Sequence, residues 1–204
     1  MYPERSFGKP SNESPQVYPS HRDMRVITGK YKGRRFDVPR TFKARPTTDF
    51  AKESLFNVLL GYIDFEEGPV ALDLFAGTGS ITLELLSRGC SKVVSVEKDP
   101  LHYNFICKFI EKLQDTAAIP IRGDVFKYLE KCREKFDFIF ADPPYTLSEL
   151  DQLPDLIMGH GLLKKDGLFV LEHGKVNDFT HNPNFVEHRA YGSVNFSFFK
   201  AKNA

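Results

Sequence analysis

A regular alternation of apolar runs and amphipathic segments is the feature that most constrains how this chain can fold. Between residues 70 and 173, short runs rich in Val, Ile, Leu and Phe alternate with longer segments whose apolar residues recur at helical spacing. Parallel neighbouring strands need a crossover connection, and helices on both faces leave such strands almost wholly apolar. We therefore predict an α/β fold with a doubly wound, mainly parallel sheet. The five expected strands are VALDLF (70–75), KVVSVE (92–97), AAIPIRGD (117–124), FDFIFAD (136–142) and GLFVLEH (167–173).

The tail of the chain completes the prediction of a seven-stranded sheet. The stretch FVEHRAYGSVNFSFFKA (185–201) has two strand-like runs separated by Tyr-Gly-Ser, which predicts an antiparallel hairpin at the edge of the sheet. Helices are expected over the segments between the five strands, at residues 79–89, 100–114, 125–134 and 147–161.

The residues before the first of these strands predict three smaller units. Residues 1–23 are rich in Pro, Ser and Asn, which is typical of a disordered arm. Residues 24–45 contain MRVITGKYKGRRFDVP, which alternates around two glycines and predicts a basic β-hairpin. The next stretch, TTDFAKESLFNVLLGYI, predicts a helix with Thr47 or Thr48 as its N-cap and Gly61 as its stop. We expect this helix to open a single domain, residues 46–204, that holds the sheet.

Positive charge is concentrated in the hairpin region. The whole chain has a formal net charge of +1, whereas residues 22–45 contain nine Lys or Arg against two Asp, a net charge of +7. A basic segment on a mildly acidic remainder favours a polyanionic partner held at one end. Taken alone, the charge is explained slightly better by a solvated hairpin. If the hairpin grips phosphate, the expected contacts are Arg25, Lys30, Lys32, Arg34 and Arg35.

The composition argues against several other classes of protein. No apolar run approaches the roughly 20 residues of a membrane-spanning helix, and the N-terminal stretch lacks the apolar region of a signal peptide. The three cysteines form no C-x-x-C pair, which is typical of free thiols in a reducing cytosol. The six histidines show no metal-ligand spacing. We therefore expect a cytoplasmic protein without a membrane segment or a metal. Nothing suggests an obligate dimer, so a monomer is expected.

A glycine-containing turn, LDLFAGTGS (72–80), follows the first strand. Gly77 and Gly79 let backbone N–H groups approach a ligand at the start of the next helix. A dinucleotide fingerprint would need a third glycine where this chain has Thr82, and a Walker loop would need Gly-Lys-Ser/Thr, which is absent. On its own, the turn is equally explained as a tight β-to-α connection.

Acidic residues follow the next two strands. Glu97 lies 20 residues after Gly77, at the tip of the second strand, where a carboxylate can accept hydrogen bonds from both ribose hydroxyls. Asp124 follows the third strand and could accept from an adenine amine, and it is also expected as a helix N-cap. Glu97 alone would be a solvated strand-end acid. Together, the three strand tips favour an adenosine site without a phosphate partner.

The fourth strand ends in the rigid corner DPPY (142–145). In a doubly wound sheet the strand order reverses between the first and fourth strands, so Asp142 should face a ligand on the glycine turn. A nucleobase amine is a poor nucleophile because its lone pair is delocalised into the ring. The Asp142 carboxylate and the Pro143 carbonyl can accept its two N–H bonds, while Tyr145 can stack on the ring. A proline-stiffened loop would need neither the acid nor the aromatic residue, so we favour amine chemistry.

In this order, the stretches LDLFAGTGS, VEKD, GDVF and DPPY resemble the class I S-adenosylmethionine-dependent methyltransferases that act on exocyclic amines. With MRVITGKYKGRRF and RPTTDFAKESLFNVL upstream, the chain resembles the bacterial RsmD family of 16S ribosomal RNA guanine-N2 methyltransferases. The resemblance runs from Met24 to the last strand. DPPY is shared by enzymes that act on DNA, RNA and protein, whereas the KGRRF and RPTTD stretches point to this family.

The resemblance implies a Rossmann-like methyltransferase domain with a role for each matching residue. S-adenosyl-L-methionine would be the cofactor, and ribosomal RNA or a small-subunit assembly particle would be the partner. The base amine would be oriented by Asp142, Pro143 and Tyr145; some relatives have Phe in place of Tyr145, whose hydroxyl has no assigned role. Arg45, Thr47 and Thr48 are expected near the cofactor carboxylate or the RNA. The residues expected at the cofactor are Asp73, Phe75, Gly77 and Gly79 at its methionine end, Glu97 at its ribose, and Asp124 with Val125 at its adenine.

Other functions stay open at this point. An amino-methyltransferase acting on DNA adenine or on a protein glutamine would share the DPPY corner. An NAD-dependent oxidoreductase on the same fold is disfavoured by the missing third glycine and by the DPPY corner. A non-catalytic RNA-binding module would bind RNA and transfer nothing.

Overall fold

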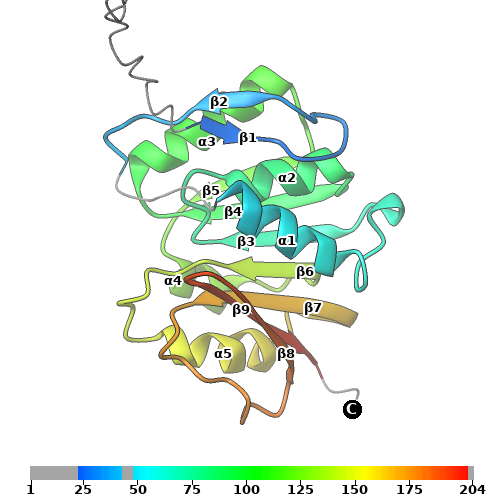
Figure 1. Ribbon diagram of the computed structural model, residues 1–204, viewed down its shortest axis with the longest axis vertical. Coiled ribbons are helices and arrows are strands. Elements are labelled where there is room, and N and C mark those ends of the chain that lie inside the picture. The colour runs from blue at the N-terminus through cyan, green and yellow to red at the C-terminus, as the bar shows by residue number, and fades with distance from the viewer. Residues whose placement is uncertain (1–22, 43–47, 202–204) are drawn as a thin grey trace, which may run out of the picture.

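The computed structural model describes residues 23–42 and 48–201, and it confirms the predicted seven-stranded sheet (Figure 1). The strand order is β5-β4-β3-β6-β7-β9-β8. The first five strands are parallel, and β9 and β8 form the predicted antiparallel hairpin at the edge. The strands are β3 (Val70–Leu74), β4 (Lys92–Glu97), β5 (Ala118–Arg122), β6 (Phe136–Ala141), β7 (Leu163–His173), β8 (Phe185–Tyr191) and β9 (Val194–Lys200).

Helices cover both faces of the sheet because successive side chains of each buried strand point to opposite sides. Ala71 of β3 packs in one core with α1 (Asp49–Leu59) and α2 (Ser80–Arg88). Leu72 packs in the other core with α4 (Val125–Lys131) and α5 (Leu153–Gly159). The remaining described helices are α3 (Pro100–Leu113) and the 3₁₀ turns Phe65–Glu67 and Leu150–Gln152. Within the described ranges, no helix combines the length and the apolar character that crossing a bilayer requires.

The basic hairpin forms a separate small sheet that lies over α2 and α3 (Figure 1). Its strands, β1 (Asp23–Arg25) and β2 (Arg35–Asp37), are antiparallel. Met24 and Phe36 enter a third hydrophobic core, which Phe109 of α3 shares. Buried Glu84 of α2 fixes the hairpin from below by accepting hydrogen bonds from the N–H groups of residues 27 and 28.

Three predicted boundaries need correction. The predicted arm, residues 1–23, lies outside the described residues except for Asp23, which belongs to β1. The helix expected over residues 147–161 is a 3₁₀ turn followed by the short α5, because Pro154 is accommodated only in the first turn of a helix. The fifth strand begins at Leu163 rather than Gly167, through an irregular stretch in which Asp166 has a φ of 63°.

Candidate active site

Every functional residue predicted from the strand tips lies at the carboxyl edge of the parallel strands. β3 is flanked by β4 on one side and by β6 on the other, so the predicted reversal of strand order occurs beside β3. The register Leu74↔Ala141 places the turn after β3 next to the DPPY corner after β6. The Asp142 N–H donates to the Leu74 carbonyl at 3.3 Å and continues this pairing by one step.

The turn between β3 and α2 has left-handed backbone at three positions. Phe75, Gly77 and Gly79 have φ values of 59°, 55° and 75°. A side chain at Gly79 would meet the Phe109 ring at 2.7 Å, whereas at Gly77 only the Phe75 carbonyl lies within 4 Å, at 3.8 Å. Gly79 therefore serves packing against α3, and Gly77 leaves an open approach to the turn. The two glycines of one motif have different physical roles.

Asp73 connects the end of β3 to α2. It is 1% exposed, and its Oδ2 accepts from the Thr82 N–H at 3.0 Å and from the Thr82 hydroxyl at 2.5 Å. Burial raises the pKa of Asp73 to about 7, against the lowering effect of the Thr82 hydrogen bonds, and Glu97 adds to the rise. Thr82, which stands where a dinucleotide fingerprint has glycine, thus has a structural function in this turn.

The two acids predicted at an adenosine both accept hydrogen bonds from the protein. Glu97 accepts from the N–H of Gly77 and from the N–H of Asp99, each at 2.7 Å, one on each carboxylate oxygen. Asp124 is the N-cap of α4, as predicted, and it also pairs with Lys98 at 3.1 Å. Each carboxylate oxygen has two acceptor positions, so both residues retain capacity for a ligand.

The residues around the Gly77 turn fit an adenosine-containing cofactor. Glu97 is tied to the open side of the Gly77 turn, where it can accept from ribose hydroxyls. The Phe75 ring meets the Phe126 ring edge-on at 6.3 Å, which supplies an apolar aromatic surface between β3 and α4. The turn presents no Lys or Arg, in keeping with a ligand that carries no phosphate.

The DPPY corner positions an acid and an aromatic ring differently with respect to solvent. Asp142 is half-buried and Pro143 is buried, whereas Tyr145 is 47% exposed. The Pro144 carbonyl accepts from the Leu147 N–H at 2.8 Å, which closes a turn. The Tyr145 hydroxyl donates to Glu172 Oε1 at 2.9 Å. The hydroxyl for which the sequence offered no role therefore anchors the ring to the neighbouring strand β7.

The carboxyl groups of Asp73, Asp142 and Glu172 lie at this edge, and burial raises the pKa of each. Desolvation raises the pKa of Asp142 well above its usual range, and the nearby charges of Glu172 and Asp73 raise it further. Burial also raises the pKa of Glu172 to about 7, although its hydrogen bond from Tyr145 opposes the rise. Clustered acids with raised pKa values are typical of functional sites.

Glu172 is the site residue that the sequence analysis missed. Leu171 pairs with Ala141, so Glu172 is the next residue of β7 beside Asp142. The signal was available, because Glu172 ends an apolar run as Glu97 and Asp142 do. The predicted strand with the run LFVLEH thus carries an acid near its tip, as the other strands of the site do.

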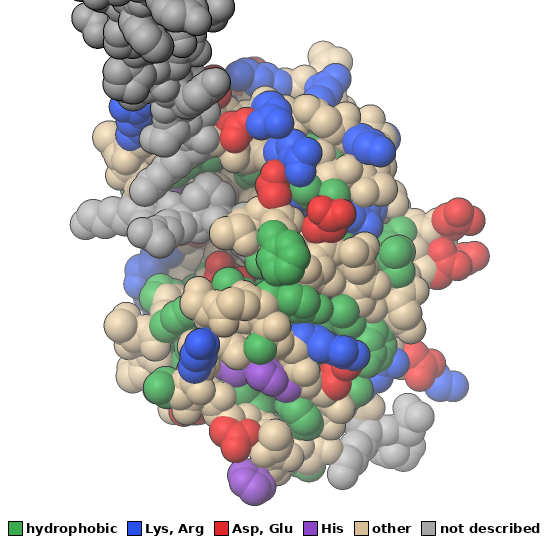
Figure 2. Space-filling model, in the orientation of Figure 1, with side chains coloured by type: hydrophobic (Ala, Val, Ile, Leu, Met, Phe, Trp, Pro, Cys, Tyr) green, Lys and Arg blue, Asp and Glu red, His purple; other side chains and the backbone are tan. Residues whose placement is uncertain are grey.

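The predicted RNA contacts do not form one surface. Figure 2 shows Lys and Arg side chains interspersed with acidic ones over the hairpin. Three of the predicted cations are paired: Arg25 with Asp49 at 2.8 Å, Lys30 with Asp115 at 2.9 Å, and Arg35 with Asp23. Arg34 lies over the Tyr31 ring at 5.5 Å, and Lys32 is exposed with no ion pair to any described residue.

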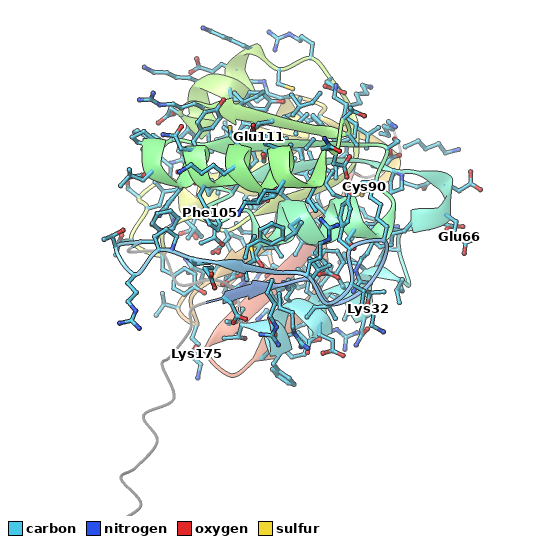
Figure 3. The ribbon with its side chains drawn as sticks, turned by 90° about the horizontal axis from the view of Figure 1, so that it is seen from above. Lys32, Glu66, Cys90, Phe105, Glu111 and Lys175 are labelled. Carbon is cyan, nitrogen blue, oxygen red and sulfur yellow. The ribbon has the colours of Figure 1, made fainter. Side chains whose placement is uncertain are left out.

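The hairpin turn lies far from the DPPY corner. The N–H of Lys30 donates to the carbonyl of Ser87 at 2.7 Å, at the end of α2 that is remote from the carboxyl edge. Figure 3 accordingly shows Lys32 toward one end of the molecule and Lys175, which follows β7, toward the other. Thr48 caps α1 by accepting from the Ala51 N–H, whereas the predictions for Arg45 and Thr47 lie outside the described residues.

Comparisons with known proteins identify the family of this chain. The family described as Conserved hypothetical protein 95 matches residues 24–200. "Putative rRNA methyltransferase YlbH" of Bacillus subtilis is 36% identical over 156 residues, which cover 74% of this chain and 83% of that protein. "Ribosomal RNA small subunit methyltransferase D" of Escherichia coli is 30% identical over 167 residues, which cover 81% of this chain and 83% of that protein.

A solved structure extends the similarity to three dimensions. A hypothetical protein of Thermus thermophilus superposes with a TM-score of 0.76 and 29% identity, covering 87% of this chain and 99% of that one. The chain therefore belongs to the family described as Conserved hypothetical protein 95, the RsmD-like and YlbH-like S-adenosylmethionine-dependent methyltransferases.

Proposed function

We propose that this protein transfers a methyl group from S-adenosylmethionine to the exocyclic N2 amine of a guanine in small-subunit (16S) ribosomal RNA. The observation that carries the proposal is the placement of the DPPY acid, half-buried beside the open Gly77 turn, in a chain whose relatives include a small-subunit ribosomal RNA methyltransferase. The substrate is either free RNA or an assembling small-subunit particle.

The protein's own groups supply position and hydrogen-bond acceptors. S-adenosylmethionine, when bound, supplies a methyl group on a sulfonium, which is a good leaving group. Glu97 and Asp124 would hold its ribose and adenine, beside the turn that carries Asp73, Phe75, Gly77 and Gly79 and beside Val125. Asp142 and the Pro143 carbonyl accept the two N–H bonds of the amine and direct its lone pair out of the ring plane.

Proton removal falls to Asp142 in this scheme. The amine nitrogen gains a methyl group and must lose one proton to become neutral. A carboxylate whose pKa lies well above its usual range is a better proton acceptor than an ordinary exposed aspartate. The target base has to leave its stack to reach these groups, which favours a loop or an open strand as substrate.

Methyl incorporation provides the test of this function. The protein is incubated with labelled S-adenosylmethionine and small-subunit RNA, either free or bound to ribosomal proteins, and the nucleosides are then analysed. The proposal expects label in N2-methylguanosine at one position. Parallel incubations with DNA and with protein separate the amino-methyltransferases that share DPPY, and label in those polymers instead of RNA would refute the proposal.

Asp142→Ala gives the corresponding prediction for the site. Loss of one preorganised acceptor at the reacting group should lower the single-turnover rate by about 10²–10³. Glu111→Ala, an exposed substitution on α3, is the control and should leave the rate unchanged. A near-normal rate for Asp142→Ala would remove this residue from the mechanism.

A further inference from the structure

Glu172 carries an unusual buried oxygen. The residue is only 6% exposed, and its Oε1 accepts from the Tyr145 hydroxyl at 2.9 Å. Its Oε2 is enclosed and has no hydrogen-bond partner among the described residues. A buried carboxylate oxygen without a partner is costly, and such groups in folded proteins usually have a functional reason.

The sheet register places the Glu172 carboxylate on the same face of the sheet as Asp142. Paired residues of parallel strands present their side chains on the same face, and the pairing Leu171↔Ala141 puts Glu172 beside Asp142. Phe196 of β9, which pairs with Glu172, belongs to the core under α1 and α2, and so does Phe140 of β6, two residues before Asp142. The two acids therefore share one face, and the charge of Glu172 helps to raise the pKa of Asp142.

We propose that Glu172 Oε2 accepts the N1–H of the target guanine and thereby selects guanine over other purines that carry an amine at C2. This inference rests on the proposed function. On the Watson–Crick edge of guanine, the N1–H lies next to the N2 amine, so a base held by Asp142 and Pro143 turns a second donor toward β7. A purine with a bare N1 lone pair would meet a carboxylate there and be repelled.

Tyr145 links this recognition to the approach of the base. Because Oε2 is enclosed in the free protein, a side chain has to move before a base can reach it. Tyr145 is 47% exposed and hydrogen-bonded to the same carboxyl group, so its rotation would uncover Oε2 while its ring turns toward the base. An N–H donor arriving at Oε2 would favour the ionised carboxylate.

RNA containing 2-aminopurine tests the proposal. This base keeps the amine at C2 but has an N1 lone pair in place of N1–H. Once the methylated guanine is located, the same RNA is synthesised with 2-aminopurine at that position, and single-turnover methylation of both RNAs is measured. The wild type should prefer guanine by about 10²-fold or more, since sites built for a hydrogen bond strongly reject the mismatched analogue.

Glu172→Gln should shift this preference toward 2-aminopurine by at least about tenfold. The Tyr145 hydroxyl would hold the amide oxygen, which leaves the NH₂ group at the position of Oε2, where it donates to the bare N1. Because both RNAs are measured on one preparation, the ratio is independent of the fraction of folded protein. Tyr145→Phe is the comparison: it keeps the carboxylate and should keep the preference for guanine.

Each outcome has a distinct meaning. Methylation of guanine with an unchanged preference in Glu172→Gln would overturn this proposal and leave the proposed function standing. Equal rates on both RNAs in the wild type would overturn it as well. Failure to methylate guanine in any RNA would refute the proposed function, and this inference with it.

Discussion

At the scale of single residues, the acids of the candidate site combine a structural cost with a proposed chemical role. Asp73 is satisfied by Thr82, whereas Glu172 has one satisfied oxygen and one without a partner among the described residues. Folding therefore favours the protonated forms of these groups, which is the reverse of the usual behaviour of a paired surface acid. The pH dependence of stability follows from that difference.

We predict that the free energy of unfolding falls between pH 5 and pH 8, and that Glu172→Gln makes the fall smaller. The pKa of Glu172 is about 7 in the folded protein and lies near 4.5 when the side chain is solvated. A raised pKa stabilises the fold fully below the unfolded value, and this contribution is lost as pH rises through the folded value. The shift sets an upper limit of about 3 kcal/mol.

Urea denaturation at pH 5 and pH 8 measures this difference. Glu130→Gln, on the exposed surface of α4, is the control and should keep the wild-type change. If Glu172→Gln shows the same loss of stability as the wild type, Glu172 does not titrate in this range.

The sequence allows some site residues to be predicted and not others. Asp142 and Glu97 are recognisable as candidates because each lies at the end of an apolar run that predicts a strand, and Asp124 because it lies between a predicted strand and a predicted helix. The pairing of Tyr145 with Glu172 is not recognisable, because it depends on which strands become neighbours and on their register. Side-chain partners across strands are a property of the assembled sheet.

At the scale of elements, the turn from β3 to α2 shows how one motif divides its functions. Gly77 and Gly79 both have positive φ, so any other residue costs strain at either position. Only Gly79 lies against a neighbouring helix. Gly79 therefore serves packing, whereas Gly77 leaves one side of the turn open.

We predict that Gly79→Ala destabilises the protein by about 2–4 kcal/mol, from left-handed strain together with overpacking against Phe109. Gly77→Ala should cost about 1 kcal/mol, because strain is its only penalty. Denaturant unfolding measures both. Gly77→Ala should nevertheless weaken binding of S-adenosylmethionine in calorimetry, since the added methyl group enters the open side of the turn. Equal stability losses in the two variants would contradict this division.

The predicted boundary of a strand is wrong where polar residues continue the strand. Lys164, Lys165 and Asp166 lie before the predicted start of the fifth strand at Gly167, yet they belong to β7. The ion pair of Lys164 with Asp137, at 2.7 Å, and the left-handed Asp166 accommodate them in an irregular pairing with β6. Tertiary contacts override local preference here, which a single sequence does not reveal.

At the scale of the whole molecule, the basic hairpin of β1 and β2 extends from the carboxyl edge of the parallel strands to their opposite edge. Lys52 is 1% exposed and donates to the Arg25 carbonyl at 2.5 Å and to Ser80 Oγ at 3.1 Å, which fixes one end of the hairpin near the start of α2. Tyr31 donates to Asp115 at 2.8 Å and fixes the other end near the start of β5. The hairpin is thus a rigid arm laid along α2.

This arrangement limits how the hairpin can serve an RNA substrate. Arg25 lies near the carboxyl edge, where the target base would react, and the N–H of its neighbour Val26 donates to the Arg34 carbonyl at 3.0 Å, whereas Lys32 lies in the turn at the opposite end. An RNA that contacts both Arg25 and Lys32 has to run along the hairpin for the length of α2. A substrate restricted to the carboxyl edge would never reach the turn.

We expect the RNA to follow the hairpin, because Lys32 is exposed without an ion pair among the described residues and Arg34 is held only by the Tyr31 ring within that part of the chain. Replacing both by Ala should weaken RNA binding and lower the slope of log K against log salt by about 0.7 per lost phosphate contact on a single strand. The matched control removes two exposed lysines from the opposite face, Lys131 and Lys135, at or just after the end of α4, and should leave the slope unchanged. Binding is measured by titration at several salt concentrations. An unchanged slope in the hairpin variant would confine the RNA to the carboxyl edge and leave the turn with a purely structural role.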